Sequence, residues 1–270
     1  MSEPALSTVS ALRPAKRAPL PQAPRVFDKI DVVPSSSALK EHLAVLQSRY
    51  EGADAATLLE GTIKREFPGR ITTVSSFGSE SVVLLHLISQ IDPTVPVIFL
   101  NTGKLFGETL RYRDRLQAKL GLTDLRSIGP HPDDERALDP DGTLWSRDPD
   151  ACCNFRKVLP LRRALAGFEA EITGRKRFQT LARGAMSSIE LNGSRFVVNP
   201  LHSWSLADLV QHIERHDLPR HPLVADGFLS IGCMPCTERV KEGDDYRSGR
   251  WAGSSKDECG IHENLEGDGI

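Results

Sequence analysis

Short apolar runs alternate with longer amphipathic stretches along most of this chain. Strands are predicted over residues 71–74, 95–100, 125–128, 168–173 and 196–198, and the segment at 95–100 is fully apolar. Stretches with apolar residues three or four positions apart predict helices over residues 35–50, 54–67, 80–91, 108–120 and 205–215. Strands that alternate with helices are typical of an α/β fold with a doubly wound, mostly parallel sheet.

The loop after the first predicted strand is a candidate anion site. It reads SSFGS at residues 75–79 and opens the next predicted helix. In open α/β sheets, ligands bind outside the carboxyl ends of the strands, and free backbone N–H groups at a helix start attract anions. Ser75, Ser76 and Gly78 are therefore candidate phosphate contacts. A plain strand-to-helix turn with a serine cap explains the same residues equally well.

The composition of the chain excludes several classes of partner. Of the 270 residues, 39% are hydrophobic and 26% are charged, and the formal net charge is −2. This balance gives no overall attraction to nucleic acid or to a membrane surface. No apolar run approaches the roughly 20 residues of a membrane-spanning helix. We therefore expect a cytoplasmic protein with no nucleic-acid or membrane partner.

Four of the five cysteines form two pairs, Cys152-Cys153 and Cys233-x-x-Cys236. Without an export signal, such pairs indicate a metal site or catalysis more often than structural disulfides. Adjacent side chains on a helix point about 100° apart, which suits two irons of a cubic cluster better than one zinc ion. The four thiolates therefore predict a 4Fe–4S centre. A closed zinc site with the same four ligands, a redox dithiol and ordinary buried thiols are the alternatives.

The fifth cysteine, Cys259, is the candidate nucleophile, although an isolated tail cysteine usually has no role. A nucleophilic thiolate needs neighbouring cations. Arg247, Arg250 and Lys256 precede it and His262 follows it.

Further basic residues are candidates for binding a charged substrate. Lys157 lies four residues after Cys153, on the same face if the stretch is helical. Arg183 follows the predicted strand 168–173, together with Arg175 and Lys176. Each alone is also explained as a solvated charge. As a group, these basic residues supply the positive charge that binding of a nucleotide anion requires.

Three segments are predicted along the chain. Residues 1–30, rich in Pro, Ala and Ser, predict a disordered tail without the apolar core of a secretory signal. Residues 31–237 are expected to form the nucleotide-binding and cluster-binding α/β domain. Residues 238–270, rich in Gly, Ser, Asp, Arg and Lys, predict a mobile C-terminal arm that carries Cys259.

Several motifs taken together resemble the iron–sulfur type of assimilatory adenylyl-sulfate reductase. They are CCNFRK at 152–157, GCMPCT at 232–237, RSGRW at 247–251, KDECGIH at 256–262, SSFG at 75–78 and FLNTG at 99–103. The resemblance covers the chain from about residue 35 to its end. It implies a fold of the adenine-nucleotide α-hydrolase type.

The resemblance also implies a reaction, a cofactor and partners. Members of this family reduce adenosine 5′-phosphosulfate to sulfite and AMP, in sulfate assimilation and cysteine biosynthesis. By resemblance, Cys259 attacks the sulfate sulfur, expels AMP and becomes an S-sulfonate that thioredoxin, or glutaredoxin, then reduces. One 4Fe–4S cluster per chain would be held by the two cysteine pairs, and a homo-oligomer is expected.

Other functions stay open at this point. Relatives that use 3′-phosphoadenylyl sulfate mostly lack the four cluster cysteines, so their presence favours the substrate without the 3′-phosphate. Asn101 stands where the family usually has Asp, and His221 is also unusual, which leaves a 3′-phosphoadenylyl-sulfate reductase or a dual-specificity enzyme open. A zinc-stabilised nucleotide-binding module leaves Cys259 unexplained. An adenylate-forming enzyme ranks lower because the loop at 75–81 departs from the SGGxDS pattern.

Overall fold

The computed structural model describes residues 35–251 and Ile261. The chain divides into two units, Met1–Val33 and Pro34–Ile270, and only the second contains described residues. Two predicted site residues, Cys259 and His262, lie outside the described residues. No helix in the described part is long and apolar enough to cross a membrane.

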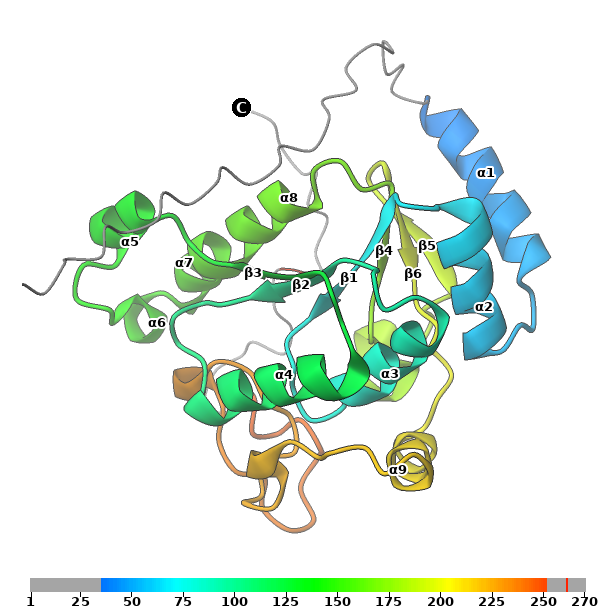
Figure 1. Ribbon diagram of the computed structural model, residues 1–270. Helices are drawn as coiled ribbons and strands as arrows, with labels where there is room; N and C mark the ends of the chain where they lie inside the picture. Colours follow the sequence, from blue (N-terminus) through cyan, green and yellow to red (C-terminus); the bar gives the residue numbers. More distant parts are fainter. Residues whose placement is uncertain (1–34, 252–260, 262–270) are drawn as a thin grey trace, which may run out of the picture. The chain divides into compact units, whose positions relative to one another are not determined.

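The centre of the fold is a six-stranded sheet with the order β3-β2-β1-β4-β6-β5 (Figure 1). Its strands are β1 (Ile71–Ser75), β2 (Val97–Leu100), β3 (Leu125–Ile128), β4 (Ala170–Ile172), β5 (Ile189–Asn192) and β6 (Arg195–Val198). All neighbours are parallel except β5, which runs antiparallel to β6. The predicted doubly wound, mostly parallel sheet is therefore confirmed. Strand order reverses between β1 and β4, where such sheets bind their ligands.

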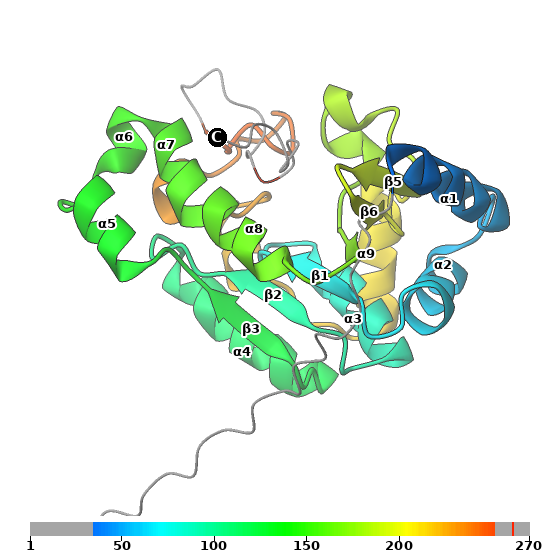
Figure 2. The same ribbon diagram turned by 90° about the horizontal axis from the view of Figure 1, so that it is seen from above.

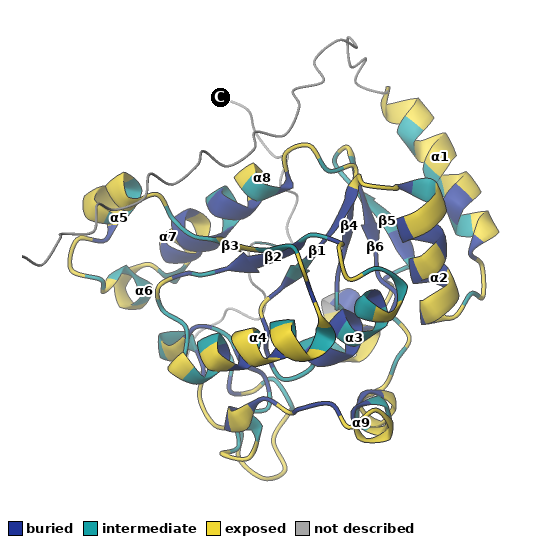
Figure 3. Cartoon of the chain, viewed as in Figure 1, coloured by how far each residue is buried: buried dark blue, intermediate teal, exposed yellow. Residues whose placement is uncertain are grey.

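Helices cover both faces of this sheet (Figures 1 and 2). They are α1 (Ser36–Arg49), α2 (Ala55–Gly61), α3 (Ser81–Ile91), α4 (Gly107–Leu120), α5 (Pro132–Leu138), α6 (Leu144–Arg147), α7 (Pro149–Cys153), α8 (Leu159–Leu165) and α9 (Leu206–Arg215). The main core joins one face to α1–α4 and α9. On the other face, Ile98 and Leu100 of β2 pack against Leu161 and Leu165 of α8. Figure 3 shows that β1 and β2 are mostly buried, whereas α4 and α5 carry exposed residues.

Several boundaries differ from those that the sequence predicts. The helix predicted over 54–67 ends at Gly61 and continues as a π-helical turn, Thr62–Glu66. A side chain at Gly61 would collide with the ring of Tyr50, so only glycine allows α1 and α2 to approach this closely. Strand β5 was not predicted, because its apolar and polar residues alternate over only four positions and form no continuous apolar run.

The start of the predicted C-terminal arm is attached to the rest of the unit. The amide of Glu238 donates to the Gly249 carbonyl at 2.7 Å, and the amide of Trp251 donates to the Cys236 carbonyl at 3.2 Å. Trp251 is buried, and it packs with Cys153 and Ile261. The mobility of the predicted arm and its boundary at residue 238 stay predictions.

Candidate functional site

A cleft of about 240 Å³ lies at the reversal point of the sheet. Its walls come from the loop after β1, the loop after β4, helix α8 and the segment 230–251. The predicted substrate contacts that line this cleft are Ser75, Ser76, Gly78, Lys157, Arg183, Arg247 and Arg250. The structure thus brings together, in one cavity, candidates that are far apart in the sequence. Their contacts with substrate stay predictions.

The loop after β1 is held in a fixed conformation by its own residues. Phe77 has a φ of +50°, which non-glycine residues seldom adopt, and its ring is buried edge-on against Phe99. The Phe77 amide donates to Oγ of Ser75 at 3.2 Å. A side chain at Gly78 would lie 3.1 Å from the Ile231 carbonyl oxygen, so a small residue suits this position. The loop therefore lines the cleft in a well-defined conformation, and its role as an anion site stays a prediction.

Positive charge dominates the lining of the cleft. The basic residues in the described lining are Lys157, Arg175, Lys176, Arg183, Arg247 and Arg250. The acidic residues there are Glu80 and Glu171. Lys176 is ion-paired with Glu80, and its burial lowers the pKa of its ammonium. Basic residues outnumber acidic residues in this described lining by six to two, which favours a polyanionic ligand.

The four predicted metal ligands line a second, small cavity beside the cleft. Cys152 and Cys153 come from the end of α7, while Cys233 precedes a 3₁₀ turn that ends at Cys236. None of these four described cysteines forms a disulfide. The Met234 amide donates to the Lys104 carbonyl at 2.7 Å, which fixes this turn against the loop after β2. Within the described residues, no group of three or more His, Cys, Asp or Glu side chains is arranged to hold a single metal ion.

Cationic and polar groups surround the four thiols. Lys157 Nζ lies 3.8 Å from Sγ of Cys153, and Thr102 Oγ1 lies 3.2 Å from Sγ of Cys233. Burial raises the pKa of the Cys152 thiol, and the nearby Arg156 opposes this effect. Four thiols around one cavity, with cations to offset thiolate charge, fit a thiolate-bound iron–sulfur centre.

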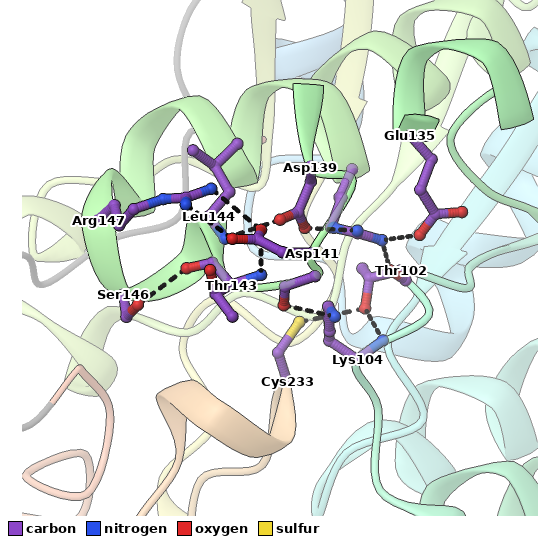
Figure 4. Close-up of polar contacts among 12 residues, drawn as sticks. Thr102, Lys104, Glu135, Asp139, Asp141, Thr143, Leu144, Ser146, Arg147 and Cys233 are labelled. Atoms are coloured by element: carbon purple, nitrogen blue, oxygen red, sulfur yellow. Dashed lines mark hydrogen bonds and ion pairs between the residues drawn. The ribbon is translucent and has the colours of Figure 1, made fainter. Parts of the chain in front are cut away.

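A buried ion-pair network lies behind this cavity (Figure 4). Arg156, which is 2% exposed, donates to Asp139 and Glu135 at 2.7 Å each and to the Thr102 carbonyl at 2.8 Å. Thr102 also contacts Cys233, so the network reaches the CxxC turn. Asp139 and Glu135 were not predicted from the sequence, because nothing in their spacing indicates a contact with Arg156.

Two further cleft residues were also missed. Tyr246 lies 3.0 Å from Ser79 through their hydroxyl oxygens, and burial raises the pKa of its phenol. Glu171 lies in β4, inside the strand that the sequence predicts over residues 168–173. A glutamate within a strand predicted to lie in the central sheet was the signal that could have revealed it.

Comparison with known proteins places this geometry in a family. The family model of the phosphoadenosine phosphosulfate reductase domain matches residues 70–239. The chain belongs to the phosphoadenosine phosphosulfate reductase family.

The relatives within this family carry two kinds of name. An adenosine 5′-phosphosulfate reductase of Mesorhizobium japonicum is 47% identical over 88% of this chain and 93% of its own. An enzyme of the same name from Deinococcus radiodurans is 46% identical over 69% of this chain and 74% of its own. A phosphoadenosine 5′-phosphosulfate reductase of Gloeobacter violaceus is 39% identical over 82% and 92%.

A solved structure of the family supports the fold. The phosphoadenylyl-sulfate reductase of Candida auris, crystallised with phosphate, is similar with a TM-score of 0.63 and 26% identity. The match covers 74% of this chain and 97% of that protein. The predicted fold of the adenine-nucleotide α-hydrolase type is confirmed by this likeness.

Proposed function

We propose that this protein reduces adenosine 5′-phosphosulfate to sulfite and AMP in sulfate assimilation and cysteine biosynthesis. The observation that carries the proposal is the position of Lys157, which lines both the cationic cleft and the four-cysteine cavity. A substrate anion in the cleft and a thiolate centre in the cavity would share this one ammonium. The relatives named for this activity, at up to 47% identity, support the choice of substrate.

The roles of the chain's own residues follow from the cleft. The loop at 75–79 and Arg183, Arg247 and Arg250 would bind the phosphosulfate and orient it. Cys259 and His262 lie outside the described residues, whereas Ile261 lines the cleft, which supports a nucleophile acting there.

The proposed reaction has two covalent steps. In the first, the Cys259 thiolate forms a bond to the sulfate sulfur, the bond from sulfur to the bridging oxygen breaks, and AMP leaves with that electron pair. In the second, a thioredoxin or glutaredoxin thiolate attacks the Cys259 sulfur and sulfite leaves. A second thiol of the reductant then releases the Cys259 thiolate and leaves the reductant as a disulfide.

Cys152, Cys153, Cys233 and Cys236 would together hold one 4Fe–4S cluster per chain. When bound, the cluster supplies a fixed local charge and links the end of α7 to the turn Met234–Cys236. Lys157, Arg156 and Thr102 are the described groups that would tune that charge. A closed zinc site uses the same ligands and is separated from the cluster by metal analysis of anaerobically prepared protein.

Trapping the intermediate tests this function directly. The protein is incubated with ³⁵S-labelled adenosine 5′-phosphosulfate without reductant, and the added mass is mapped by peptide mass spectrometry. The label should lie on Cys259 and should be absent from the Cys259→Ser variant. Label on another residue, or turnover by the serine variant, would contradict the proposal. A zinc-stabilised binding module predicts nucleotide binding with no label at all.

Substrate preference, reductant and assembly are settled by parallel measurements. The relative named a phosphoadenosine 5′-phosphosulfate reductase keeps the 3′-phosphorylated substrate, or dual specificity, as the second candidate. Turnover of both substrates with thioredoxin and with glutaredoxin decides between these. We place the reaction in the cytoplasm and expect a homo-oligomer, which light scattering at several protein concentrations measures.

A further inference from the structure

Glu171 is an unusual residue for the floor of an anion-binding cleft. It lies in the middle of β4, is 8% exposed, and is one of the residues that line the cleft. Within the described residues its carboxyl makes no hydrogen bond and no ion pair. Burial raises the pKa of this carboxyl, and only the more distant Arg195 and Arg175 oppose that effect. A buried carboxyl without a donor is costly, so a ligand that brings a donor is expected.

Neighbouring cations do not supply that donor, because both are committed elsewhere. Arg175 donates to Thr173 and lies 3.3 Å from both Glu190 and Asn199. Arg195 donates to the backbone carbonyls that close the turn before β4. The Glu171 carboxyl is therefore left facing the cleft itself.

The register of the sheet shows which part of a nucleotide Glu171 would meet. Glu171 pairs with Thr72 of β1, so its side chain points to the same face as Val74, two residues further along. On that face, Val74 joins Leu100 of β2 and Leu161 of α8 in an apolar cluster. A flat apolar base fits this side of the cleft. The sugar then falls on the β4 side, above Glu171, with the phosphates toward the cations at the strand ends.

An adenine nucleotide offers few hydrogen-bond donors. They are the 6-amino group of the base and the 2′- and 3′-hydroxyls of the ribose, since the other polar groups are acceptors or anions. With the base on the β2 side, the ribose hydroxyls are the donors that face β4. We propose that the Glu171 carboxylate accepts hydrogen bonds from the ribose hydroxyls of the bound nucleotide and thereby selects a free 3′-hydroxyl over a 3′-phosphate.

The selectivity follows from charge and from hydrogen bonding together. A 3′-phosphate would replace a donor with an anion next to a buried carboxylate, which is repulsive in a site of low polarity. The inference rests on the proposed function only in taking an adenine nucleotide as the ligand of the cleft. Nucleotide binding tests it without any sulfur chemistry.

The test compares binding of five nucleotides by isothermal titration calorimetry. The ligands are AMP, 2′-deoxy-AMP, 3′-deoxy-AMP, IMP and adenosine 3′,5′-bisphosphate. Wild-type protein should bind at least one deoxy nucleotide about 10-fold or more weakly than AMP, because a hydrogen bond to a charged acceptor is lost. In Glu171→Leu the difference in affinity between AMP and that deoxy nucleotide should fall below about 2-fold. In Glu171→Gln the bisphosphate should gain about 10-fold or more relative to AMP, because the repelling charge is gone.

A matched control lies in the same segment of the chain. Glu169 precedes β4, is exposed and pairs with Arg70 outside the cleft, so Glu169→Gln should bind all five nucleotides like wild type. The proposal is overturned if wild-type protein binds both deoxy nucleotides as tightly as AMP, a result that needs no variant to fold. It is also overturned if Glu171→Leu still binds the deoxy nucleotide more weakly than AMP to the same degree as wild type. A third contradicting result is that wild type binds IMP more weakly than AMP and Glu171→Leu removes this difference instead.

Failure of this inference and failure of the proposed function give different results. If wild-type protein reduces neither sulfonucleotide while the weaker binding of the deoxy nucleotide depends on Glu171, the ribose contact stands and the reaction is wrong. If wild-type protein reduces adenosine 5′-phosphosulfate while the Glu171 variants keep the selectivity of wild type, the reaction stands and the ribose contact is wrong.

Discussion

The Lys157 ammonium lies 3.8 Å from Sγ of Cys153, four residues earlier in the chain, and it also lines the substrate cleft. One cation therefore lies beside both the predicted cluster ligands and the cleft proposed for the substrate anion. It is buried, so its charge acts through little intervening water.

Removing this charge should affect the chemical step more than nucleotide binding. We expect Lys157→Gln to lower kcat for adenosine 5′-phosphosulfate by about 10²-fold, the cost of losing one preorganised group beside a developing charge. AMP lacks the sulfate, so its Kd should change by less than about 3-fold. Steady-state kinetics and calorimetry measure the two quantities.

Lys104 provides the matched comparison for Lys157. It lines the cysteine cavity but not the cleft, and its ammonium donates to the Gly142 carbonyl at 2.8 Å. Lys104→Gln should leave KM and kcat within about 3-fold of wild type. Equal losses in the two variants would show that Lys157 acts only through the cysteine cavity.

The iron–sulfur proposal predicts a sharp contrast between two cysteine variants. Cys236→Ser should lose the brown colour and the bound iron, since one of four ligands is missing. Cys259→Ser should keep wild-type iron content and lose turnover. Absorbance near 400 nm and iron analysis of anaerobically purified proteins measure this. Iron-free wild-type protein with full activity would overturn the cluster proposal.

The buried pair of Arg156 and Asp139 predicts a stability difference against an exposed pair nearby. The two side chains are 2% and 0% exposed. Asp139→Ala leaves a buried guanidinium with Glu135, which is 47% exposed, as its remaining carboxylate partner, and should lower the free energy of unfolding by about 3 kcal/mol. Urea unfolding at pH 7 measures the change.

An exposed pair in the same region serves as the control. Arg147 and Asp141 are joined at 2.8 Å with about half of each side chain exposed (Figure 4). Asp141→Ala should therefore lower the free energy of unfolding much less than Asp139→Ala does.

The pH dependence gives an independent check on Asp139. Burial by itself would raise its pKa, but the Leu144 amide and Arg156 outweigh this and hold the pKa below its ordinary value. The difference between wild type and Asp139→Ala should then shrink as the pH falls below about 4.

The sequence predicted those parts of the fold that depend on local pattern. Strands β1, β2, β3, β4 and β6 were all predicted, and the apolar run of β2 is the kind of pattern that needs no partner to be recognised. Strand β5 was not predicted, because its pairing with β6 is a tertiary contact that its own four residues do not indicate. The helices between β3 and β4 were missed because they are short and face a cavity rather than the main core.

The candidate site shows the same division between local and tertiary information. Ser75, Ser76 and Gly78 could be placed because a loop at a strand end has a known position in this fold class. Arg156 was named only as part of the CCNFRK motif, because its structural role depends on a contact with Asp139, which lies seventeen positions earlier. Glu171 was not predicted as a site residue, because its possible role depends on the cleft above β4, which forms only in the folded chain.

Three histidines between α3 and α9 predict a pH-dependent loss of stability. His86 Nδ1 lies 3.1 Å from His212 Nε2, and the His212 and His216 ring centroids are 4.5 Å apart. Burial, together with the neighbouring His216 and His86, lowers the pKa of His212 to about 4. The unfolded chain, in which His titrates near about 6.5, then binds more protons than the folded protein between these two values. The free energy of unfolding should therefore fall as the pH drops from about 6.5 to about 4.

Replacing one ring isolates this contribution. Wild-type protein should lose more stability between pH 7 and pH 4.5 than His212→Gln, because the variant has no imidazole to protonate at that position. His131 is exposed, lies at the start of α5 and is not part of the three-histidine cluster. It gives the control variant His131→Gln, whose loss of stability between the two pH values should match that of wild type. Urea midpoints at the two pH values measure the effect. Parallel pH profiles for wild type and His212→Gln would show that the cluster does not resist protonation.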